Sequence, residues 1–360
     1  MTELDDLGAI ERLDTLDMLG ELESFADKMR GALAIGQGVT GLPDGLGVDS
    51  VAVLGMGGSA ASGDLVRALV EPRVPVPFAV VKSYGPLPEW VGRNTLVLAV
   101  SYSGDTEETL YTFDEAHERG ARVVSLSAGG RLAEMAEEFG GAHILVPPGL
   151  QPRAAIAYLL VPLLVVMARM GLVSDPTEDI EESMSVLADM APRCDRMTPR
   201  VENPAKDLAA RLAGRVPILY GGPGIGGAIA RRFKCELNEY AKFHAFCNEI
   251  PEMNHNEIVG WTTAAEIGGD YVAVWIDDPD DDDRINLRWQ ITRNLIEDSA
   301  ADIVELTPEG ESPLARLSSL LYMTGLAAIY TAISHGVDPG PVEVIDDLKK
   351  RLAETERTSL

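Results

Sequence analysis

The stretch Leu96-Val-Leu-Ala-Val-Ser-Tyr-Ser-Gly-Asp-Thr106 passes from an uninterrupted apolar run into a polar turn, and a segment of helical length begins near Glu107. Similar apolar runs, separated by polar segments of helical length, recur through the first half of the chain: Val51–Leu54, Phe78–Val81, Val123–Leu126 and Ile144–Val146. Continuous apolar strands that alternate with helices are typical of a parallel sheet covered on both faces. This half is therefore predicted to be an αβα sandwich, closed by a long helix from Ala154 to Met170.

A second alternation of strands and helices begins at Val216. It opens, like the first, with a strand, a glycine-rich turn and a helix, which indicates a duplicated domain. Its expected strands are Val216–Tyr220, Tyr271–Ile276 and Ile303–Leu306, and its expected helices end near Lys242, Asp298 and Ser334. We predict an N-terminal helical segment over residues 1–45, a first domain over 46–172, a helical connection over 173–212 and a second domain over 213–360.

The composition excludes some classes of partner. The chain has 30 Lys and Arg against 57 Asp and Glu, a net charge of −27, which repels nucleic-acid backbones.

The longest apolar stretch, Ala154 to Met167, contains Tyr158 and Pro162 and falls short of the ~20 residues of a membrane span, so we interpret it as a buried helix. The N-terminus does not resemble a signal peptide, and only three cysteines are present, so we expect a cytoplasmic protein.

The polar turn at Ser101–Thr106 is a candidate phosphate site. Three hydroxyls, those of Ser101, Ser103 and Thr106, lie at the start of a helix, where backbone N–H groups and the helix dipole favour an anion. Such a site holds a dianion without lysines, which suits a strongly acidic chain. An ordinary N-cap by Ser103 or Thr106 is the structural alternative, but it accounts for one hydroxyl only.

The turn Gly55-Met-Gly-Gly-Ser59 also joins a strand to a helix and could bring the backbone close to a ligand. Tight packing of the strand against the helix explains it equally well, and its glycine spacing is not that of a dinucleotide-binding turn. The second half has no equivalent of the turn at Ser101–Thr106: where its corresponding strand ends, the chain carries the acidic run Asp277–Asp283, which would repel a phosphate. We interpret its last part, Asp280–Asp283, as a solvated turn.

The second half carries two further polar segments, Arg232–Lys242 and Asn254–Trp261. Glu236 and Glu239 on one helix are by themselves typical of a solvated, salt-bridged face. His255 lies between two asparagines, which favours a positioned, hydrogen-bonded imidazole. No second pair at ligand spacing accompanies His244 and Cys247, so we expect no metal site.

Together these segments resemble the bifunctional phosphoglucose/phosphomannose isomerases of the SIS (sugar isomerase) superfamily. The resemblance extends from about Val51 to Leu352 and rests on four motifs: Gly55-Met-Gly-Gly-Ser59, Ser101-Tyr-Ser-Gly-Asp-Thr106, Glu236-Leu-Asn-Glu239 with Lys242, and Asn254-His-Asn-Glu257. It implies two SIS-type αβα domains and a cofactor-free aldose–ketose isomerase acting on glucose 6-phosphate, mannose 6-phosphate and fructose 6-phosphate.

The resemblance also implies roles for individual residues. Glu239 would be the base, Arg153 would stabilise the enediolate, and His255 would open the sugar ring from the partner subunit of a homodimer. Lys349, with Lys350 as the second choice, would assist at the ring oxygen. The phosphate group would be held by Gly58, Ser59, Ser101, Ser103 and Thr106.

The chain departs from the family pattern at Tyr240, where Asn is usual, and at Gly340, where Thr is frequent. Neither change removes a catalytic group, but both bear on whether the site accepts both epimers. The competing hypotheses are an isomerase of an aminosugar phosphate or arabinose phosphate and a sugar-phosphate sensor that performs no chemistry. A sensor would need Ser101 and its neighbours, but it would have no use for Glu239, His255 and Arg153 together.

Overall fold

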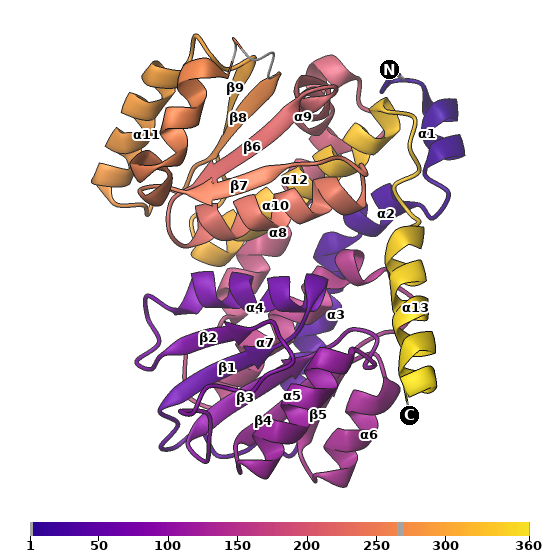
Figure 1. Cartoon of the computed structure of the whole chain (residues 1–360), viewed down its shortest axis with the longest axis vertical. Coiled ribbons are helices and arrows are strands. Elements are labelled where there is room, and N and C mark those ends of the chain that lie inside the picture. The colour runs from indigo at the N-terminus through magenta and orange to yellow at the C-terminus, as the bar shows by residue number, and fades with distance from the viewer. Residues whose placement is uncertain (1–2, 265, 267–269, 360) are drawn as a thin grey trace.

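The computed structural model describes residues 3–264, 266 and 270–359, which form two parallel sheets flanked by helices (Figure 1). The first sheet has the strand order β2-β1-β3-β4-β5 and the second β7-β6-β8-β9, and every neighbouring pair of strands is parallel. The strands of the first sheet are β1 (Ser50–Leu54), β2 (Phe78–Val81), β3 (Thr95–Val100), β4 (Arg122–Ser127) and β5 (Ala142–Leu145). Those of the second are β6 (Val216–Gly221), β7 (Phe246–Glu249), β8 (Tyr271–Ile276) and β9 (Asp302–Leu306). The predicted α/β class with two αβα sandwiches is confirmed.

Alternate residues of the first sheet pack into separate cores. Leu96 and Leu98 of β3 join the main core, while Val97 and Ala99 face a smaller one. The main core includes α3 (Phe25–Gly38), α4 (Gly57–Val70) and α7 (Ile156–Arg169), and the smaller includes α5 (Glu107–Glu118) and α6 (Gly130–Glu138). Both faces of the sheet are thus dry, which explains why its strands are apolar throughout.

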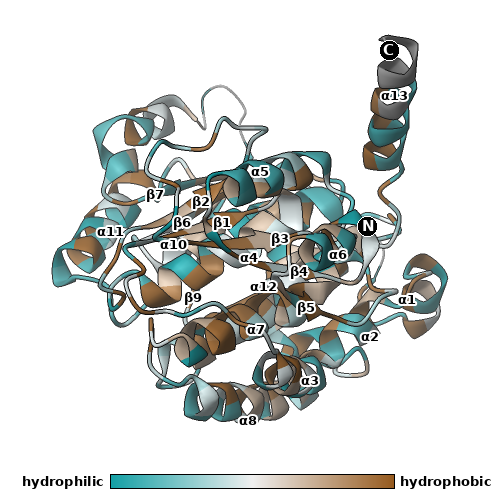
Figure 2. Cartoon of the chain, turned by 90° about the horizontal axis from the view of Figure 1, so that it is seen from below, coloured by the Kyte–Doolittle hydropathy of each residue, from teal (hydrophilic) through white to brown (hydrophobic). Residues whose placement is uncertain are grey.

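The helices after β6 are α10 (Ile225–Glu239), α11 (Asp283–Ile296), α12 (Pro313–Ser334) and α13 (Glu343–Ser359), and α12 packs against α8 (Thr177–Cys194) and α9 (Pro204–Leu212). Two helical stretches, Pro152–Arg169 and Pro313–Ser334, are long and apolar enough to cross a membrane, but they are 78% and 94% buried within the fold. Both are therefore interior helices, as expected for the first. Figure 2 shows the apolar segments gathered inside, and α13 projecting away from the body.

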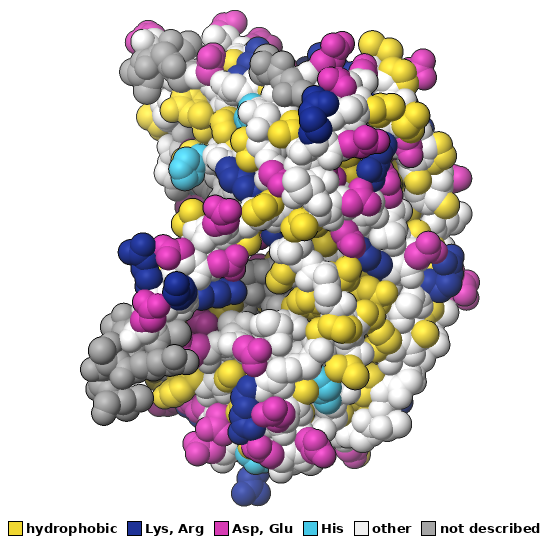
Figure 3. All heavy atoms as spheres, turned by 90° about the vertical axis from the view of Figure 1, so that its right-hand side faces the viewer, with side chains coloured by type: hydrophobic (Ala, Val, Ile, Leu, Met, Phe, Trp, Pro, Cys, Tyr) yellow, Lys and Arg dark blue, Asp and Glu magenta, His cyan; other side chains and the backbone are white. Residues whose placement is uncertain are grey.

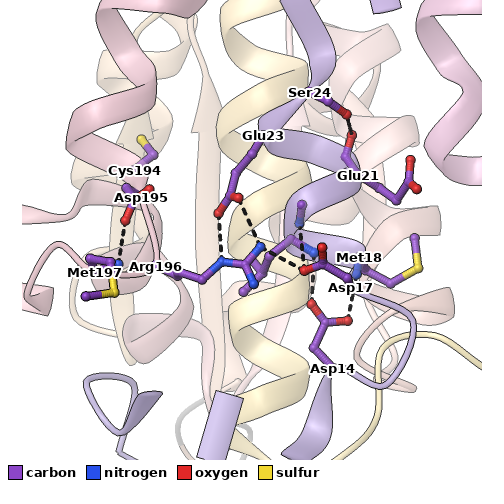
Figure 4. A network of polar contacts seen from close by, with 12 residues as sticks. Asp14, Asp17, Met18, Glu21, Glu23, Ser24, Cys194, Asp195, Arg196 and Met197 are labelled. Atoms are coloured by element: carbon purple, nitrogen blue, oxygen red, sulfur yellow. Dashed lines mark hydrogen bonds and ion pairs between the residues drawn. The ribbon is translucent and has the colours of Figure 1, made fainter. Parts of the chain in front are cut away.

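The N-terminal segment differs from a single helical stretch. It forms α1 (Leu7–Leu13), α2 (Met18–Glu23) and α3, because Asp14 and Asp17 interrupt the helix. The carboxylate of Asp14 accepts hydrogen bonds from the backbone N–H groups of Met18 and Leu19, at 2.7 and 2.9 Å, and so caps α2. Arg196, which follows α8, forms a two-pronged hydrogen bond with Glu23 (Figure 4). This contact fastens the N-terminal helices to the middle of the chain.

The acidic run Asp277–Asp283 is anchored within the fold, and the interpretation of Asp280–Asp283 as a solvated turn was wrong for Asp280 and Asp281. Asp278 is buried and paired with the buried Arg316, whose guanidinium also contacts Asp280. The carboxylate of Asp281 lies against Gly222, in the turn before α10, and one of its oxygens is buried without a hydrogen-bond partner in the described residues. The partner of Asp278 and Asp280 is Arg316, which is more than 30 residues away in the sequence, so the local sequence does not predict these ion pairs.

Neutralising Asp281 is expected to stabilise the protein at alkaline pH. Burial, reinforced by Asp278, Asp277 and Asp280, raises the pKa of Asp281 to about 7. Between pH 4 and 7 the unfolded chain binds fewer protons at this group than the folded chain, so stability falls as pH rises. Asp281→Asn should therefore raise the free energy of unfolding by about 1 kcal/mol at pH 8, allowing for partial exposure, with little gain at pH 4.

Urea unfolding at both pH values checks this expectation. Asp283→Asn, which removes an exposed carboxylate of the same run, is the matched control for general charge relief. Equal gains from the two variants, or a gain from Asp281→Asn that does not depend on pH, would contradict the assignment.

Candidate active site

The two serine and glycine turns of the first domain lie together at the carboxyl ends of β1 and β3. The hydroxyls of Ser101 and Thr106 are hydrogen-bonded to each other at 2.9 Å, and the Oγ of Ser59 accepts a hydrogen bond from the N–H of Tyr102 at 3.2 Å. Thr106 is the N-cap of α5, yet its side chain makes no capping hydrogen bond. The capping alternative therefore fails for Thr106, and its hydroxyl stays within the turn.

Ser103 contributes differently from its neighbours. It is exposed, and its Oγ accepts a long hydrogen bond of 3.3 Å from the N–H of Asp105. Ser101, in contrast, is fully buried, and its Oγ accepts from the N–H of Gly104 at 3.1 Å. The turn thus has an inner, fixed hydroxyl and an outer one that faces solvent.

The glycines of the other turn differ in their surroundings. A Cβ on Gly55 would lie 2.9 Å from the carbonyl oxygen of Val100, so this glycine is needed for packing. Gly57 has a φ of +52° and begins α4, whose N-terminus has no side-chain cap. A Cβ on Gly58 would meet the backbone of Pro152 and Arg153 at 3.4 to 3.8 Å. The open helix start therefore lies beside Arg153.

Arg153 connects the first domain to the second. It lies in the 3-10 helix η1 (Pro152–Ala155), is 3% exposed, and places its guanidinium carbon 4.8 Å from the ring centroid of Tyr240, which follows α10. Its Nη2 donates to the carbonyl oxygen of Pro339 at 2.8 Å and to that of Gly340. Contacts from the second half of the chain thus fix the side chain of a residue that belongs to the first half.

The helix α10 brings two carboxylates to this place, in different surroundings. Glu236 is buried and accepts a hydrogen bond from Arg232 at 2.7 Å, so it does not belong to a solvated face. Burial raises the pKa of Glu236, and the charge of Arg232 partly offsets the rise. Arg232 also donates to the backbone carbonyl oxygen of Arg153 at 2.6 Å. The buried pair holds α10 against η1, and Glu239 follows one turn later, half-buried.

Lys242 belongs to one of the four sequence motifs, but the sequence predicted no role for it. It lines, with Glu239, a groove of about 680 Å³ that extends to the start of α13. Its Nζ donates to the carbonyl oxygen of Asp338 at 2.7 Å, and its φ is +51°. Burial lowers the pKa of Lys242 to about 8, and the nearby charge of Arg153 adds to the effect. Figure 3, which faces this side of the molecule, shows the hollow beside α13.

His255 lies apart from this cluster within one chain. His255 is exposed in the 3-10 helix η3 (Glu252–His255), which follows the end of β7, whereas Glu239 ends α10, the helix that leads to the start of β7. The two residues are therefore at opposite ends of that strand. Lys349 is exposed on α13, as is Lys350.

The turn that carries His255 is nevertheless well braced. Asn254 donates to the hydroxyl of Thr292 on α11 at 2.8 Å, and the carboxylate of Glu257 accepts from Tyr220 at 2.6 Å and from Asn248 at 2.7 Å. The polar neighbours of His255 therefore hold the turn, while the imidazole itself faces outward. The expected hydrogen bond to the imidazole is absent among the described residues, and only the backbone of the turn is held in place.

Comparison with known proteins identifies the family. Residues 201–352 match the family model of the bacterial phospho-glucose isomerase C-terminal SIS domain. The chain is 37% identical over 94% of its length, and 99% of the relative's, to a bifunctional phosphoglucose/phosphomannose isomerase of Caldicellulosiruptor bescii. It is 34% identical over 83% of its length, and 88% of the relative's, to the enzyme of the same name from Aquifex aeolicus.

A solved structure agrees with the fold. A glucose-6-phosphate isomerase-like protein from Thermus thermophilus superposes with a TM-score of 0.64 at 21% identity, covering 97% of this chain and 99% of the other. An identity of 21% supports similarity of the fold only. The sequence relative from Caldicellulosiruptor bescii is more similar and covers 94% of the chain. The chain therefore belongs to the bifunctional phosphoglucose/phosphomannose isomerase family.

Proposed function

We propose that this protein is a cofactor-free aldose–ketose isomerase that interconverts glucose 6-phosphate and mannose 6-phosphate with fructose 6-phosphate. One observation carries the proposal beyond the family relationship. The backbone of Arg153 lies beside the open start of α4, and its guanidinium lies over the ring of Tyr240, the residue that follows Glu239. Anion-binding donors, a fixed cation and a carboxylate are thus adjacent in one place.

The phosphate group is assigned to the first domain. Ser59, Ser101, Ser103 and Thr106 would donate hydrogen bonds, and the N–H groups at the starts of α4 and α5, Gly58 among them, would add to these. Hydroxyl and backbone donors hold a dianion inside a chain of net charge −27 without a cluster of lysines. Binding at this end leaves the reacting carbons free to extend toward the second domain.

Isomerisation moves a proton between C1 and C2 through an enediolate. Glu239 is assigned as the base that removes the proton from one carbon and returns it to the other. Arg153 is assigned to the negative oxygen that forms meanwhile, because a fixed guanidinium in a buried place stabilises a developing charge strongly. Rotation about C2–C3 of the open chain would present either face of the enediolate to Glu239, which allows both epimers.

The active unit is proposed to be a homodimer in the cytoplasm. Opening of the sugar ring is assigned to His255, whose side chain exchanges protons near neutral pH, with Lys349 assisting at the ring oxygen. His255 lies at the other end of β7 from Glu239 in one chain, so a second copy would complete the site. Apolar side chains are exposed in two regions, one near His255 and one on α13 near Lys349. They are Val259, Leu287, Ile291 and Leu295 in the first region, and Val344, Ile345, Leu348 and Leu352 in the second. Such exposed stripes are typical of surfaces that a partner covers.

Proton NMR of the purified protein with fructose 6-phosphate in heavy water, without added metal, tests the activity. Both glucose 6-phosphate and mannose 6-phosphate should form, with deuterium at C2, because the proton passes through a carboxylate that exchanges with solvent. A single epimer would restrict the substrate range and point to Tyr240 and Gly340. Saturable binding without any aldose product would overturn the hexose isomerase and favour another sugar phosphate or a sensor.

A further inference from the structure

Tyr240 is an aromatic residue at the site to which neither the motifs nor the proposed mechanism gives a role. It directly follows Glu239, its side chain is fully buried, and its ring faces the guanidinium of Arg153 at 4.8 Å. Its hydroxyl is buried and has no hydrogen-bond partner in the described residues. The hydroxyl therefore does not account for the burial of this tyrosine, and the contact that distinguishes it is the one between its ring and a cation.

The other contacts of Arg153 leave its charge available. Nη2 donates to two backbone carbonyls, and Nη1 makes a long hydrogen bond of 3.4 Å to the side chain of Gln151. Nε is buried without a partner, and within the described residues no carboxylate pairs with the guanidinium. An unpaired buried donor is costly, so this N–H is suited to an acceptor that arrives with a ligand.

The nearby arginine on α10 is held in the opposite way. Arg232 is paired with the carboxylate of Glu236 at 2.7 Å, which neutralises it. A carboxylate beside Arg153 would likewise compete with a substrate oxyanion for the same cation. The negative face of an aromatic ring attracts a guanidinium without accepting its in-plane hydrogen bonds and without carrying a net charge.

We propose that Tyr240 is a positioning residue whose ring holds Arg153 in place while leaving its charge and its Nε–H donor for the enediolate. The proposal rests on the proposed isomerase function. Because the ring acts on a group that binds the oxyanion and not the phosphate, its loss should lower kcat and leave KM for fructose 6-phosphate nearly unchanged. The hydroxyl should matter little, since it has no partner to lose.

The test compares Tyr240→Phe with Tyr240→Leu in the full-length protein. Cation–π contacts of about 0.5 to 2 kcal/mol correspond to losses of about 2- to 30-fold, so we expect kcat to fall about tenfold in Tyr240→Leu, with KM within about threefold of the native value. Tyr240→Phe should retain kcat within about twofold. A sugar-phosphate hydroxamate, which mimics the planar enediolate, should lose affinity in Tyr240→Leu by the same factor as kcat/KM.

Tyr322→Leu is the matched control for loss of a buried ring. Tyr322 is also buried with an unpartnered hydroxyl, but it lies on α12 and has no contact with Arg153 among those described. It should lower the melting temperature without changing kcat. If Tyr240→Leu does not fold, phenylalanines with increasing fluorination at position 240 keep the ring's shape while weakening its attraction for a cation, and kcat should fall along that series.

The outcomes separate this inference from the proposed function. Native protein without isomerase activity would overturn the function before any variant is compared. Native activity with an unchanged kcat in Tyr240→Leu, or across the fluorinated series, would overturn the role of the ring alone. An equal loss in Tyr240→Phe and Tyr240→Leu would also contradict it, because the hydroxyl would then be the active part.

Discussion

Replacing Glu239 with Gln will lower kcat for fructose 6-phosphate by about 10³-fold, within the 10²- to 10⁴-fold range usual for general acid–base groups. Affinity for fructose 6-phosphate should change by less than about threefold. The carboxylate is the assigned proton carrier, whereas the donors assigned to the phosphate lie in the first domain. Gln keeps the size of the side chain and its hydrogen-bonding capacity, so the loss would report on the proton transfer. NMR of samples quenched at a series of times gives kcat, and titration calorimetry gives the dissociation constant for fructose 6-phosphate.

Glu236→Gln is the control on the same helix. Glu236 is buried against Arg232, so removal of its charge leaves a buried guanidinium without its counter-ion and should cost about 3 to 5 kcal/mol of unfolding free energy. Its effect should therefore be on stability, with kcat reduced far less than in Glu239→Gln. If Glu239→Gln kept more than a tenth of native turnover, Glu239 would not be the base.

The sequence predicted the strands correctly where both faces of the sheet are buried under helices. Thr95–Val100 is buried at every position, and a continuous apolar run records that directly. The strand β7 was missed, because it lies at the edge of its sheet and its sequence Phe-Cys-Asn-Glu is only partly buried, with Phe246 exposed. An edge strand has one neighbour and needs no apolar run.

The candidate site was predictable only as separate motifs. The hydroxyls near Ser101 are adjacent in sequence, so their clustering could be read from the chain. The contact between Arg153 and Tyr240 joins two domains, and no local pattern encodes it. The same holds for Arg316, whose contacts with Asp278 and Asp280 anchor part of an acidic run to the fold. In the sequence, Tyr240 is distinguished only as a departure from the family pattern. A role for it can be inferred only from the position of its ring in the structure.

Mixing two inactive variants is expected to restore activity if His255 acts across a dimer interface. His255→Asn should lower kcat with cyclic substrate by about 10²-fold, and Glu239→Gln is nearly inactive as argued above. In a heterodimer of the two, one site would combine Glu239 of the His255→Asn chain with His255 of the Glu239→Gln chain, and so would be complete. The second site would carry both defects.

Statistical exchange of subunits makes half of the dimers heterodimers, each with one complete site, so about a quarter of the native activity should return. Sedimentation must first show a particle of twice the chain's 38.6 kDa. If His255 served the Glu239 of its own chain, every site in the mixture would keep one defect and no activity would return. The exposed turn at His255 favours recovery, because it lies at the far end of β7 from Glu239 while its backbone is held firmly enough to present the imidazole to another molecule.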